Sequence, residues 1–273
     1  MEGLIIKVLS NDYTVLYENN LYVCKATGKF RTQNITPLVG DYVEFDLKNK
    51  YITKIKTRKN SLLRPPIANI DQALIVASTK EPDFSTNLLD KLITIIQFNN
   101  IKPVIILSKL DLLNSKEIEE IEEIIKYYRS LGYKVLKNTD IVEINKIINN
   151  KISVLTGQTG SGKSSLLNRI SPSLNLKTDI ISKALGRGKH TTRHVELMNI
   201  SGGLIADTPG FSSLSLDEMT KENIRDSFLE FDKYKEFCEY RDCMHLKETK
   251  CGIKDNPNIL KSRYDNYKKF LGE

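Results

Sequence analysis

The sequence predicts an α/β fold in which a parallel sheet is preceded by a small β-barrel and followed by a charged helical region. Residues 1–60 contain short runs rich in Val, Ile, Tyr and Leu, separated by turn residues, which is typical of a small barrel. From Asp71 onward, strand-like and helix-like segments alternate, as they do in parallel sheets. After residue 216 the chain is charged and helical in pattern to its end.

The N-terminal runs favour an OB-fold barrel, a five-stranded form that commonly binds single-stranded nucleic acid. The alternative is a small sheet with no ligand of its own. Basic residues gather before Pro65 and Pro66, and because proline interrupts regular structure we expect a linker there. The predicted barrel domain therefore covers residues 1–66. Its expected strands are Leu4–Leu9, Tyr13–Tyr17, Leu21–Ala26, Asp41–Phe45 and Tyr51–Ile55.

Residues 67–216 form the expected α/β domain, and residues 217–273 form the expected C-terminal helical domain. Strands are predicted over Ala73–Ala77, Val104–Leu107, Lys134–Leu136, Ile152–Thr156, Val195–Ile200 and Leu204–Ala206. Helices are predicted over Asn87–Phe98, Lys116–Arg129, Val142–Ile148 and Leu166–Ile170. This order predicts a parallel sheet with helices on both faces.

Composition excludes two broad classes of protein. The 273 residues are 40% hydrophobic and 27% charged, which describes neither a disordered chain nor a bundle of membrane helices. The N-terminus does not resemble a secretory signal, so we expect a cytoplasmic protein that does not enter membranes. The net charge of +7 permits a polyanionic partner such as RNA, although an ordinary solvated basic surface explains it equally well.

A glycine-rich loop marks a phosphate site. The sequence G-x-x-x-x-G-K-S follows a predicted strand and precedes a predicted helix, which is the context that this motif requires. Its backbone N–H groups and the helix N-terminus favour anions. We expect Lys163 to reach the β- and γ-phosphates and the Ser164 hydroxyl to bind Mg²⁺. The predicted nucleotide-binding residues here are Gly157, Gln158, Thr159, Gly160, Ser161, Gly162, Lys163, Ser164 and Ser165.

A second motif, Asp207-Thr208-Pro209-Gly210, ends the next predicted strand. A carboxylate at this place can hold Mg²⁺ directly or through water, which makes Asp207 a predicted magnesium ligand. Gly210 has no side chain, so its N–H can approach the γ-phosphate. An ordinary turn is the alternative, and it is less favoured downstream of the glycine-rich loop.

Ser108-Lys109-Leu110-Asp111 follows another predicted strand and is similar to the Asn-Lys-x-Asp sequence with which GTPases bind guanine. Asp111 can accept hydrogen bonds from the guanine ring N–H and amino group, whereas adenine leaves a carboxylate unpaired. Ser108 stands where this motif usually has Asn, so one polar contact that braces the base-binding loop is shorter. No residue between Lys137 and Asp140 is assigned to the guanine O6. Because the base motif precedes the glycine-rich loop, the sequence predicts a circularly permuted GTPase domain.

These features together resemble one bacterial family, the ribosome small subunit-dependent GTPases called RsgA or YjeQ. The resemblance covers the barrel, Arg64-Pro65, Asn69-Ile70-Asp71, the permuted motif order, residues 186–192, Asp207 to Phe211 and the C-terminal cysteines. It implies a circularly permuted P-loop GTPase domain with an N-terminal OB-fold β-barrel and a C-terminal helical zinc-binding domain. It also implies a GTP hydrolase that binds the 30S subunit and its 16S rRNA late in maturation, stimulated by that subunit. The barrel and the zinc domain would contact rRNA, and we expect a monomer.

The C-terminal cysteine cluster has the ligand types of a metal site. Cys238, Cys243, His245 and Cys251 offer three thiolates and one imidazole, which suit a closed tetrahedral zinc ion with a structural role. Their spacing is the one that the family carries. One structural Zn²⁺ is therefore expected, besides Mg²⁺ bound with GTP. The alternative is free thiols and a surface histidine, and Cys24 is expected to be a small core residue.

Hydrolysis needs a group that orients water. Many GTPases place a glutamine after Asp-x-x-Gly, but here that position is Phe211. His190 is the predicted catalytic residue, because a neutral imidazole can orient or deprotonate water. Thr192 is expected to bind Mg²⁺ and sense the γ-phosphate, with Thr191 as the alternative. His190 has an alternative role too, RNA contact within a basic loop that includes Arg187, Lys189 and Arg193.

Two other classes of protein remain open at the level of sequence. One is an ATP-using P-loop enzyme, which Asp111 disfavours, since this aspartate selects guanine. The other is an RNA-binding module with an inactive nucleotide site, which the presence of Lys163 and Asp207 disfavours. Gly160 supplies no side-chain ligand, so nothing in the loop argues for activation by K⁺.

Overall fold

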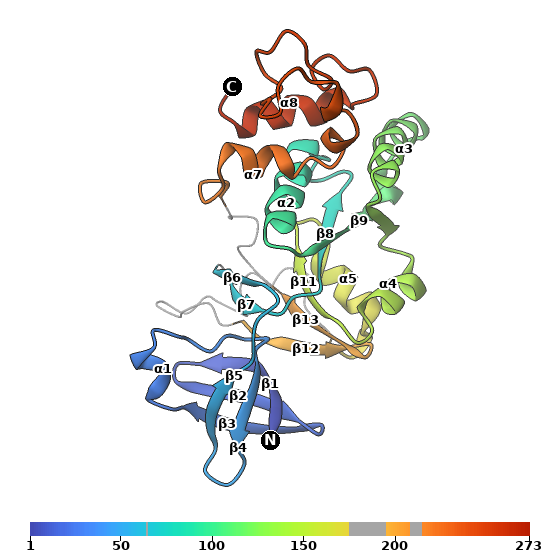
Figure 1. Ribbon diagram of the computed structural model, residues 1–273. Coiled ribbons are helices and arrows are strands. Elements are labelled where there is room, and N and C mark those ends of the chain that lie inside the picture. Colours follow the sequence, from blue (N-terminus) through green and yellow to red (C-terminus); the bar gives the residue numbers. More distant parts are fainter. Residues whose placement is uncertain (64, 175–194, 208–214) are drawn as a thin grey trace. The chain divides into compact units, whose positions relative to one another are not determined.

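The computed structural model describes residues 1–63, 65–174, 195–207 and 215–273. The chain divides into two compact units, and each unit combines segments that are distant in the sequence (Figure 1). Unit 1 holds Met1–Leu74, Thr139–Thr156 and the described part of Gly162–Phe211. Unit 2 holds Ile75–Asn138, Gly157–Ser161 and the described part of Ser212–Glu273. Among the described residues, no helix is long and apolar enough to cross a membrane.

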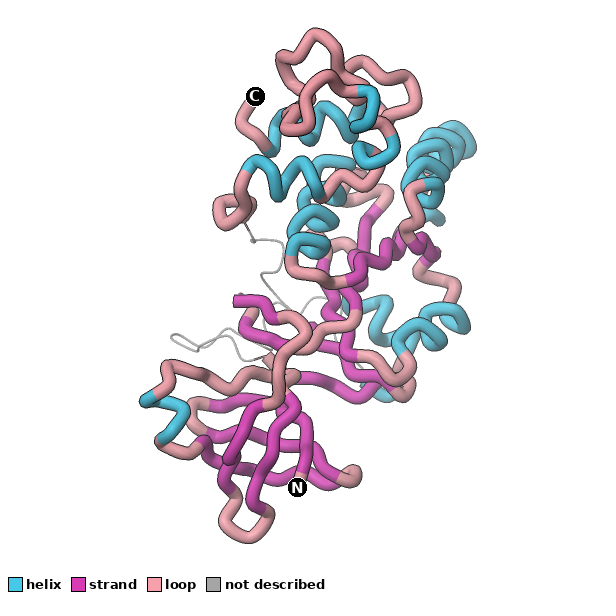
Figure 2. Tube along the Cα trace, in the orientation of Figure 1, coloured by secondary structure: helices cyan, strands magenta, loops and turns pink. Residues whose placement is uncertain are grey.

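Unit 1 begins with the predicted barrel, drawn as blue strands in Figure 1 and as magenta strands in Figure 2. The strands are β1 (Glu2–Leu9), β2 (Asp12–Tyr17), β3 (Asn20–Ala26), β4 (Tyr42–Asp46) and β5 (Tyr51–Ile55). They close in the order β1-β2-β3-β5-β4, which confirms the OB-like barrel. Alternate side chains face inward and form one apolar core. The short helix α1 (Lys29–Thr32) lies between β3 and β4, outside the strands that the sequence predicts.

Strand β1 contains an irregularity with a consequence for the rest of unit 1. Its antiparallel register with β2 shifts between Ile5 and Lys7, so an extra residue forms a β-bulge in β1. Directly after this bulge, Lys7 forms an isolated antiparallel bridge with Glu196. The Lys7 Nζ lies 2.7 Å from Glu196 Oε2. The barrel is thereby joined to the start of a strand in the α/β sheet.

The expected linker at Pro65–Pro66 is instead part of a hairpin. β6 (Ser61–Leu63) pairs antiparallel with β7 (Pro66–Ala68), and Pro66 can open a strand because the first residue need not donate a ladder hydrogen bond. The segment is fastened to the barrel, since Asn69 Nδ2 donates to Gly40 O at 2.8 Å. Gly40 has φ +87°, and a Cβ there would lie 2.1 Å from Ala68 O, so only glycine fits.

A six-stranded sheet in the order β10-β9-β8-β11-β13-β12 confirms the predicted α/β class. β9 and β10 are parallel, β11 and β13 are parallel, and β12 at the end of the order runs antiparallel to β13. The sheet is therefore mixed at that edge rather than wholly parallel. The strands are β8 (Gln72–Ser78), β9 (Lys102–Ser108), β10 (Lys134–Lys137), β11 (Ile152–Thr156), β12 (Leu197–Ile200) and β13 (Gly203–Asp207).

The helices between these strands begin at clear sequence signals. The Ser85 side chain accepts from Leu88 N at the start of α2, and Asn114 with Glu117 forms a capping box at the start of α3. The buried positions Ile121, Ile125 and Tyr128 recur along α3 at helical spacing. The helices are α2 (Thr86–Phe98), α3 (Ser115–Ser130), α4 (Ile141–Ile148) and α5 (Lys163–Ile170), with short 3₁₀ turns η1 (Leu110–Leu112) and η2 (Pro172–Leu174).

The C-terminal part of unit 2 is less helical than its sequence predicts. It contains α7 (Lys221–Asp226), the 3₁₀ turns η4 (Phe231–Lys233) and η5 (Lys235–Phe237), and α8 (Lys261–Phe270). Residues 238–260 form turns and loops without a helix. The small apolar core beneath these loops is made of Ile224, Phe228, Phe231, Ile253, Ile259, Tyr267 and Leu271. A core of this size gives the loops limited support of their own.

A buried group of charges joins α8 to α2. The Arg263 side chain is 0% exposed and donates to Asp90 Oδ1 at 2.6 Å and to Glu230 Oε1 at 2.7 Å. Tyr128 donates its hydroxyl to the Asp90 carboxylate, and the Asn266 amide does the same. The guanidinium also lies 4.5 Å from the centre of the Phe228 ring. Burial opposes the charged form, yet Asp90 and Glu230 raise the pKa of Arg263 well above its usual value.

Candidate functional site

The glycine-rich loop occupies the turn that the sequence predicts for it, between β11 and α5. Gly157 has φ +139°, and a Cβ there would lie 2.2 Å from Val76 O, so a side chain cannot be accommodated. Gly162 caps α5 in the left-handed conformation with φ 89°, and Lys163 is the first helical residue. Gln158, Thr159 and Gly160 are exposed to solvent between these points. The loop thus opens toward solvent where a phosphate chain would approach.

The guanine-binding motif predicted at residues 108–111, called here the base motif, lies beside the glycine-rich loop within unit 2. The buried Ser108, at the end of β9, donates its hydroxyl to Ser161 O at 2.6 Å. Thr79 Oγ1 donates to Ser108 O at 2.9 Å, which ties the end of β8 to the same point. Asp111 is exposed in η1, where its carboxylate can accept hydrogen bonds from a base. The structure therefore brings together two motifs that are far apart in the sequence.

Residues 79–82 also border the motif, and sequence reasoning did not include them. Lys109 Nζ donates to Glu81 O, and a Cβ on Gly160 would lie 3.6 Å from the Pro82 side chain. A signal was present, because these residues follow directly after β8. Ligands of open α/β sheets bind at the carboxyl ends of the strands, so residues there are candidates even without a motif.

We expect Ser108→Ala to weaken binding of guanine nucleotides by about tenfold, because it leaves the buried Ser161 carbonyl without this donor and frees the base loop. The dissociation rate of a fluorescent GDP analogue in stopped flow measures this. Ser153→Ala is the control, since that buried hydroxyl on β11 accepts from Gln72 and lies outside both motifs. An equal GDP dissociation rate in the two variants would contradict the bracing role of Ser108.

The predicted magnesium side of the site is described only in part. Asp207 ends β13 and pairs with Leu155 of the parallel strand β11, so its backbone lies two residues from the start of the glycine-rich loop along the neighbouring strand. Gly210, Phe211, His190, Thr191 and Thr192 lie outside the described residues. Their predicted roles remain predictions from the sequence.

The C-terminal loops bring the four predicted metal ligands together. The ligand atoms of Cys238, Cys243, His245 and Cys251 all lie within 4.8 Å of one another. His245 Nδ1 is 3.6 Å from Cys238 Sγ and 3.4 Å from Cys251 Sγ, and these two sulfurs are 4.0 Å apart. A tetrahedral zinc ion separates two sulfur ligands by about 3.8 Å and a sulfur from a nitrogen by about 3.5 Å. The donor set therefore fits one zinc ion.

Backbone donors prepare the cluster for thiolates. Gly252 N–H donates to Cys238 Sγ at 3.3 Å, and Ile253 and Lys254 N–H donate to Cys251 Sγ at 3.4 and 3.3 Å. Burial raises the pKa of the Cys238 and Cys243 thiols when no metal compensates it. Burial and the nearby Arg225 charge lower the pKa of His245 to about 4, so its imidazole is in the neutral form that binds metals.

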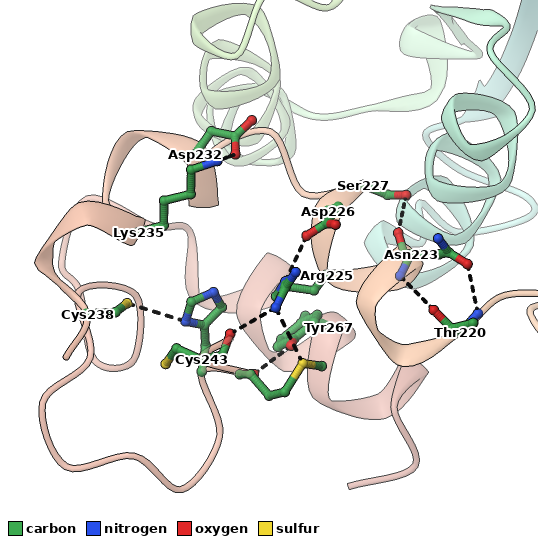
Figure 3. Close-up of polar contacts among 12 residues, drawn as sticks. Thr220, Asn223, Arg225, Asp226, Ser227, Asp232, Lys235, Cys238, Cys243 and Tyr267 are labelled. Atoms are coloured by element: carbon green, nitrogen blue, oxygen red, sulfur yellow. Dashed lines mark hydrogen bonds and ion pairs between the residues drawn. The ribbon is translucent and has the colours of Figure 1, made fainter. Parts of the chain in front are cut away.

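Side chains from α7 and α8 hold the loop that carries these ligands. Figure 3 shows Arg225 of α7 beside Cys243, whose carbonyl accepts from Arg225 Nη1 at 3.4 Å. Tyr267 of α8 donates its hydroxyl to Met244 O at 2.6 Å, and Tyr264 donates to His245 O at 2.6 Å. Glu248 accepts three N–H donors of its own loop. Despite partial burial, these backbone donors lower the pKa of Glu248 to about 2.

The class of protein follows from this combination of sheet, loop and base motif in permuted order. A solved structure titled "The crystal structure of YloQ, a circularly permuted GTPase" matches with a TM-score of 0.84 and 39% identity, covering 99% of this chain and 93% of that chain. The crystal structure of YjeQ from Thermotoga maritima matches with a TM-score of 0.86 and 34% identity, covering 99% and 97%. The chain has the fold of a circularly permuted GTPase.

The family is defined more narrowly by sequence. The family model described as RsgA GTPase matches residues 55–217, and the model described as RsgA N-terminal domain matches residues 2–55. The Small ribosomal subunit biogenesis GTPase RsgA 2 of Oceanobacillus iheyensis is 51% identical over 100% of this chain and 97% of its own length. The RsgA of a Geobacillus strain is 47% identical over the same shares. The chain belongs to the RsgA GTPase family and is a GTP hydrolase, as the resemblance implied.

Proposed function

We propose that this chain binds the 30S ribosomal subunit and hydrolyses GTP during late maturation of that subunit. In this proposal the bound 30S subunit stimulates the hydrolysis of GTP. The observation that carries the proposal is the full-length match to relatives that are named small ribosomal subunit biogenesis GTPases. The net charge of +7 suits a partner rich in phosphate. The barrel also exposes Tyr42 by 51% and Tyr51 by 45%, and such rings can stack on unpaired bases of 16S rRNA.

In this proposal the residues act as the sequence predicts. Residues 157–165 and Gly210 bind the phosphates of GTP or GDP, Ser108 to Asp111 bind guanine, and Ser164, Thr192 and Asp207 hold Mg²⁺. Mg²⁺ supplies charge neutralisation at the phosphates. Zinc on the C-terminal cysteines and His245 holds the loops that face the rRNA. The protein acts as a cytoplasmic monomer.

The test is steady-state GTP turnover by the full chain, alone and with purified 30S subunits, with ATP and 50S subunits as controls. We expect slow turnover alone, because intrinsic GTPase rates are low until a partner completes the site. Turnover should rise with 30S subunits and GTP only. Equal turnover with and without 30S subunits, or equal stimulation by 50S subunits, would contradict the proposed partner.

Asp111→Asn is expected to reduce affinity for GDP by about 100-fold or more, because the amide cannot accept both guanine donors. Affinity for xanthosine diphosphate should rise, since xanthine carries an acceptor where guanine carries its amino group. Competition binding with GDP and xanthosine diphosphate measures this change in nucleotide preference. Asp232→Asn serves as a control, because Asp232 is exposed in η4 and belongs neither to the two motifs nor to residues 79–83 beside them. Unchanged GDP affinity in Asp111→Asn would place base recognition elsewhere.

His190→Ala is expected to lower 30S-stimulated turnover by about 100-fold or more, since a positioned general base contributes on that scale. GDP affinity should stay close to that of the unaltered chain, because His190 has no proposed contact with the base. Single-turnover hydrolysis on 30S subunits measures the chemical step. The alternative role in RNA contact predicts a different result, namely weaker 30S binding with a normal maximal rate.

A further inference from the structure

The contact between Lys7 and Glu196 connects the barrel to the α/β sheet within unit 1. It combines a backbone bridge with an ion pair of 2.7 Å. The bulge in β1 lies immediately before Lys7, and bulges commonly redirect a side chain or end a pairing. Here the bulge shifts the register of β1 on β2, and pairing with β2 continues from Lys7 onward, at the residue that also bridges Glu196. The contact is thus built into the barrel's own hydrogen-bond pattern.

Glu196 lies beside the strand end that carries the predicted magnesium ligand Asp207. Leu197 pairs with Ala206 in the antiparallel register of β12 and β13, so Glu196 lies next to the end of β13, at the level of Asp207. In the sequence it comes four positions after Thr192. We call the paired ends of β12 and β13, from Glu196 to Leu197 and from Ala206 to Asp207, the metal edge of the sheet. The barrel contacts the sheet at this edge.

The ion pair is too exposed to serve mainly as a source of stability. The Lys7 side chain is 32% exposed and that of Glu196 is 40% exposed. Pairs of this kind contribute about 0–1 kcal/mol to the free energy of unfolding. β12 is the last strand in the order of the sheet, so β13 is its one neighbour there among the described strands. The bridge to Lys7 gives the start of this edge strand a second point of attachment.

We propose that Lys7 and Glu196 form a positioning pair through which a barrel bound to RNA holds the metal edge in its hydrolytic arrangement. The inference rests on the proposed function and adds the route by which the small subunit raises turnover. A barrel held on rRNA has less freedom to move, and the pair passes that restraint to the strand ends that flank Asp207. Neither residue belongs to the predicted nucleotide-binding or magnesium motifs, so each acts through the edge that it positions.

Charge reversal and charge exchange in the full chain test the pair. GTP turnover is measured alone and over a range of 30S concentrations for Lys7→Glu, for Glu196→Lys and for the variant with both changes. We expect turnover without subunits to stay within about twofold, and maximal stimulated turnover to fall about fivefold in each single variant. The exchanged pair should recover most of the loss, because opposite charges face each other again.

A matched control separates this effect from a general loss of positive charge. Lys25→Glu makes the same charge change in the pair of Lys25 with Asp12, which are 3.2 Å apart and both within the barrel. It should alter the half-saturating 30S concentration as much as Lys7→Glu does, while leaving maximal turnover intact. The half-saturating concentration reports binding and maximal turnover reports positioning, so the two roles are read independently.

Three results would overturn the inference. Single variants that retain full maximal turnover would show that the pair positions nothing. An exchanged pair as impaired as the worse single variant would show that the two residues are not coupled. If 30S subunits fail to raise turnover of the unaltered chain, the proposed function fails and this inference with it, and that outcome is distinct from the first two.

Discussion

Removing the metal from the cluster of Cys238, Cys243, His245 and Cys251 should unfold the loops of residues 238–260 while leaving the nucleotide site intact. The loops contain no helix and rest on a small core, so we expect metal ligation to supply much of their stability. Structural zinc sites bind with about 10–16 kcal/mol at neutral pH, and where no preformed site exists that energy stabilises the fold. Hydrogen exchange with mass spectrometry, with and without a chelator, locates the change.

The number of zinc ions per chain tests the same prediction, with a cysteine outside the cluster as the control. Metal analysis should find one zinc per chain in the unaltered protein and in Cys24→Ala, whose cysteine lies in the barrel core. The Cys251→Ser variant should bind much less zinc, since one of the four ligands is lost. Full protection of residues 238–260 in the chelated protein would contradict a structural role for the metal.

The pH dependence of metal loss can be derived from the ligands. Burial raises the pKa of the Cys238 and Cys243 thiols, so protons compete with zinc at these two ligands as the pH falls below neutrality. The pKa of His245 is already lowered to about 4, so the imidazole becomes protonated only at more acid pH. Release of zinc should therefore begin above pH 4 and track protonation of the thiols, which a zinc-binding dye can follow in a pH titration.

Arg263→Met should lower the free energy of unfolding of unit 2 by about 3–5 kcal/mol, because it leaves two buried carboxylates without their cation. Asp90 and Glu230 are 0% and 1% exposed, so solvent cannot replace the guanidinium. Thermal or denaturant unfolding measures the loss, by circular dichroism because the chain has no Trp. The attachment of α8 to α2 should weaken first.

A surface pair on the same helix provides the control. Lys268 and Asp265 are 39% and 37% exposed, so Lys268→Met should change stability by no more than about 0.5 kcal/mol. Adding Asp90→Asn and Glu230→Gln to Arg263→Met should recover part of the loss, since these changes remove the unpaired charges. A small effect of Arg263→Met alone would mean that water or another cation reaches the carboxylates.

Local patterns in the sequence were sufficient for much of the fold. Short runs rich in Val, Ile, Tyr and Leu between turn residues predicted the barrel strands, and the alternation of strand-like and helix-like segments after Asp71 predicted the α/β domain. The strand, glycine-rich loop and helix at residues 152–170 also follow from local signals. The four metal ligands were identified by residue type and order, and the structure brings them together. These features share one property, namely that neighbouring residues encode them.

What the sequence did not reveal depends on pairs that are distant along the chain. Arg263 and Asp90 are 173 positions apart, and nothing near either residue indicates its partner. The bridge from Lys7 to Glu196 likewise joins opposite parts of unit 1. The hairpin at Pro66 was missed because proline was taken to end regular structure, although it is compatible with the first position of a strand. The brace from Ser108 to Ser161 required knowing which strand ends are neighbours.

The close approach of Gly40 to Ala68 limits how freely domains of this protein can be exchanged with domains of its relatives. The two family models meet at residue 55, which suggests a place to cut and join domains from different relatives. Yet Gly40 leaves no room for a Cβ beside Ala68 O, and Asn69 donates to the Gly40 carbonyl. A transplanted barrel cut at residue 55 would meet a foreign hairpin at this contact. Positions 40, 68 and 69 should therefore change together among relatives, and a functional chimera should carry residues 1–69 as one piece.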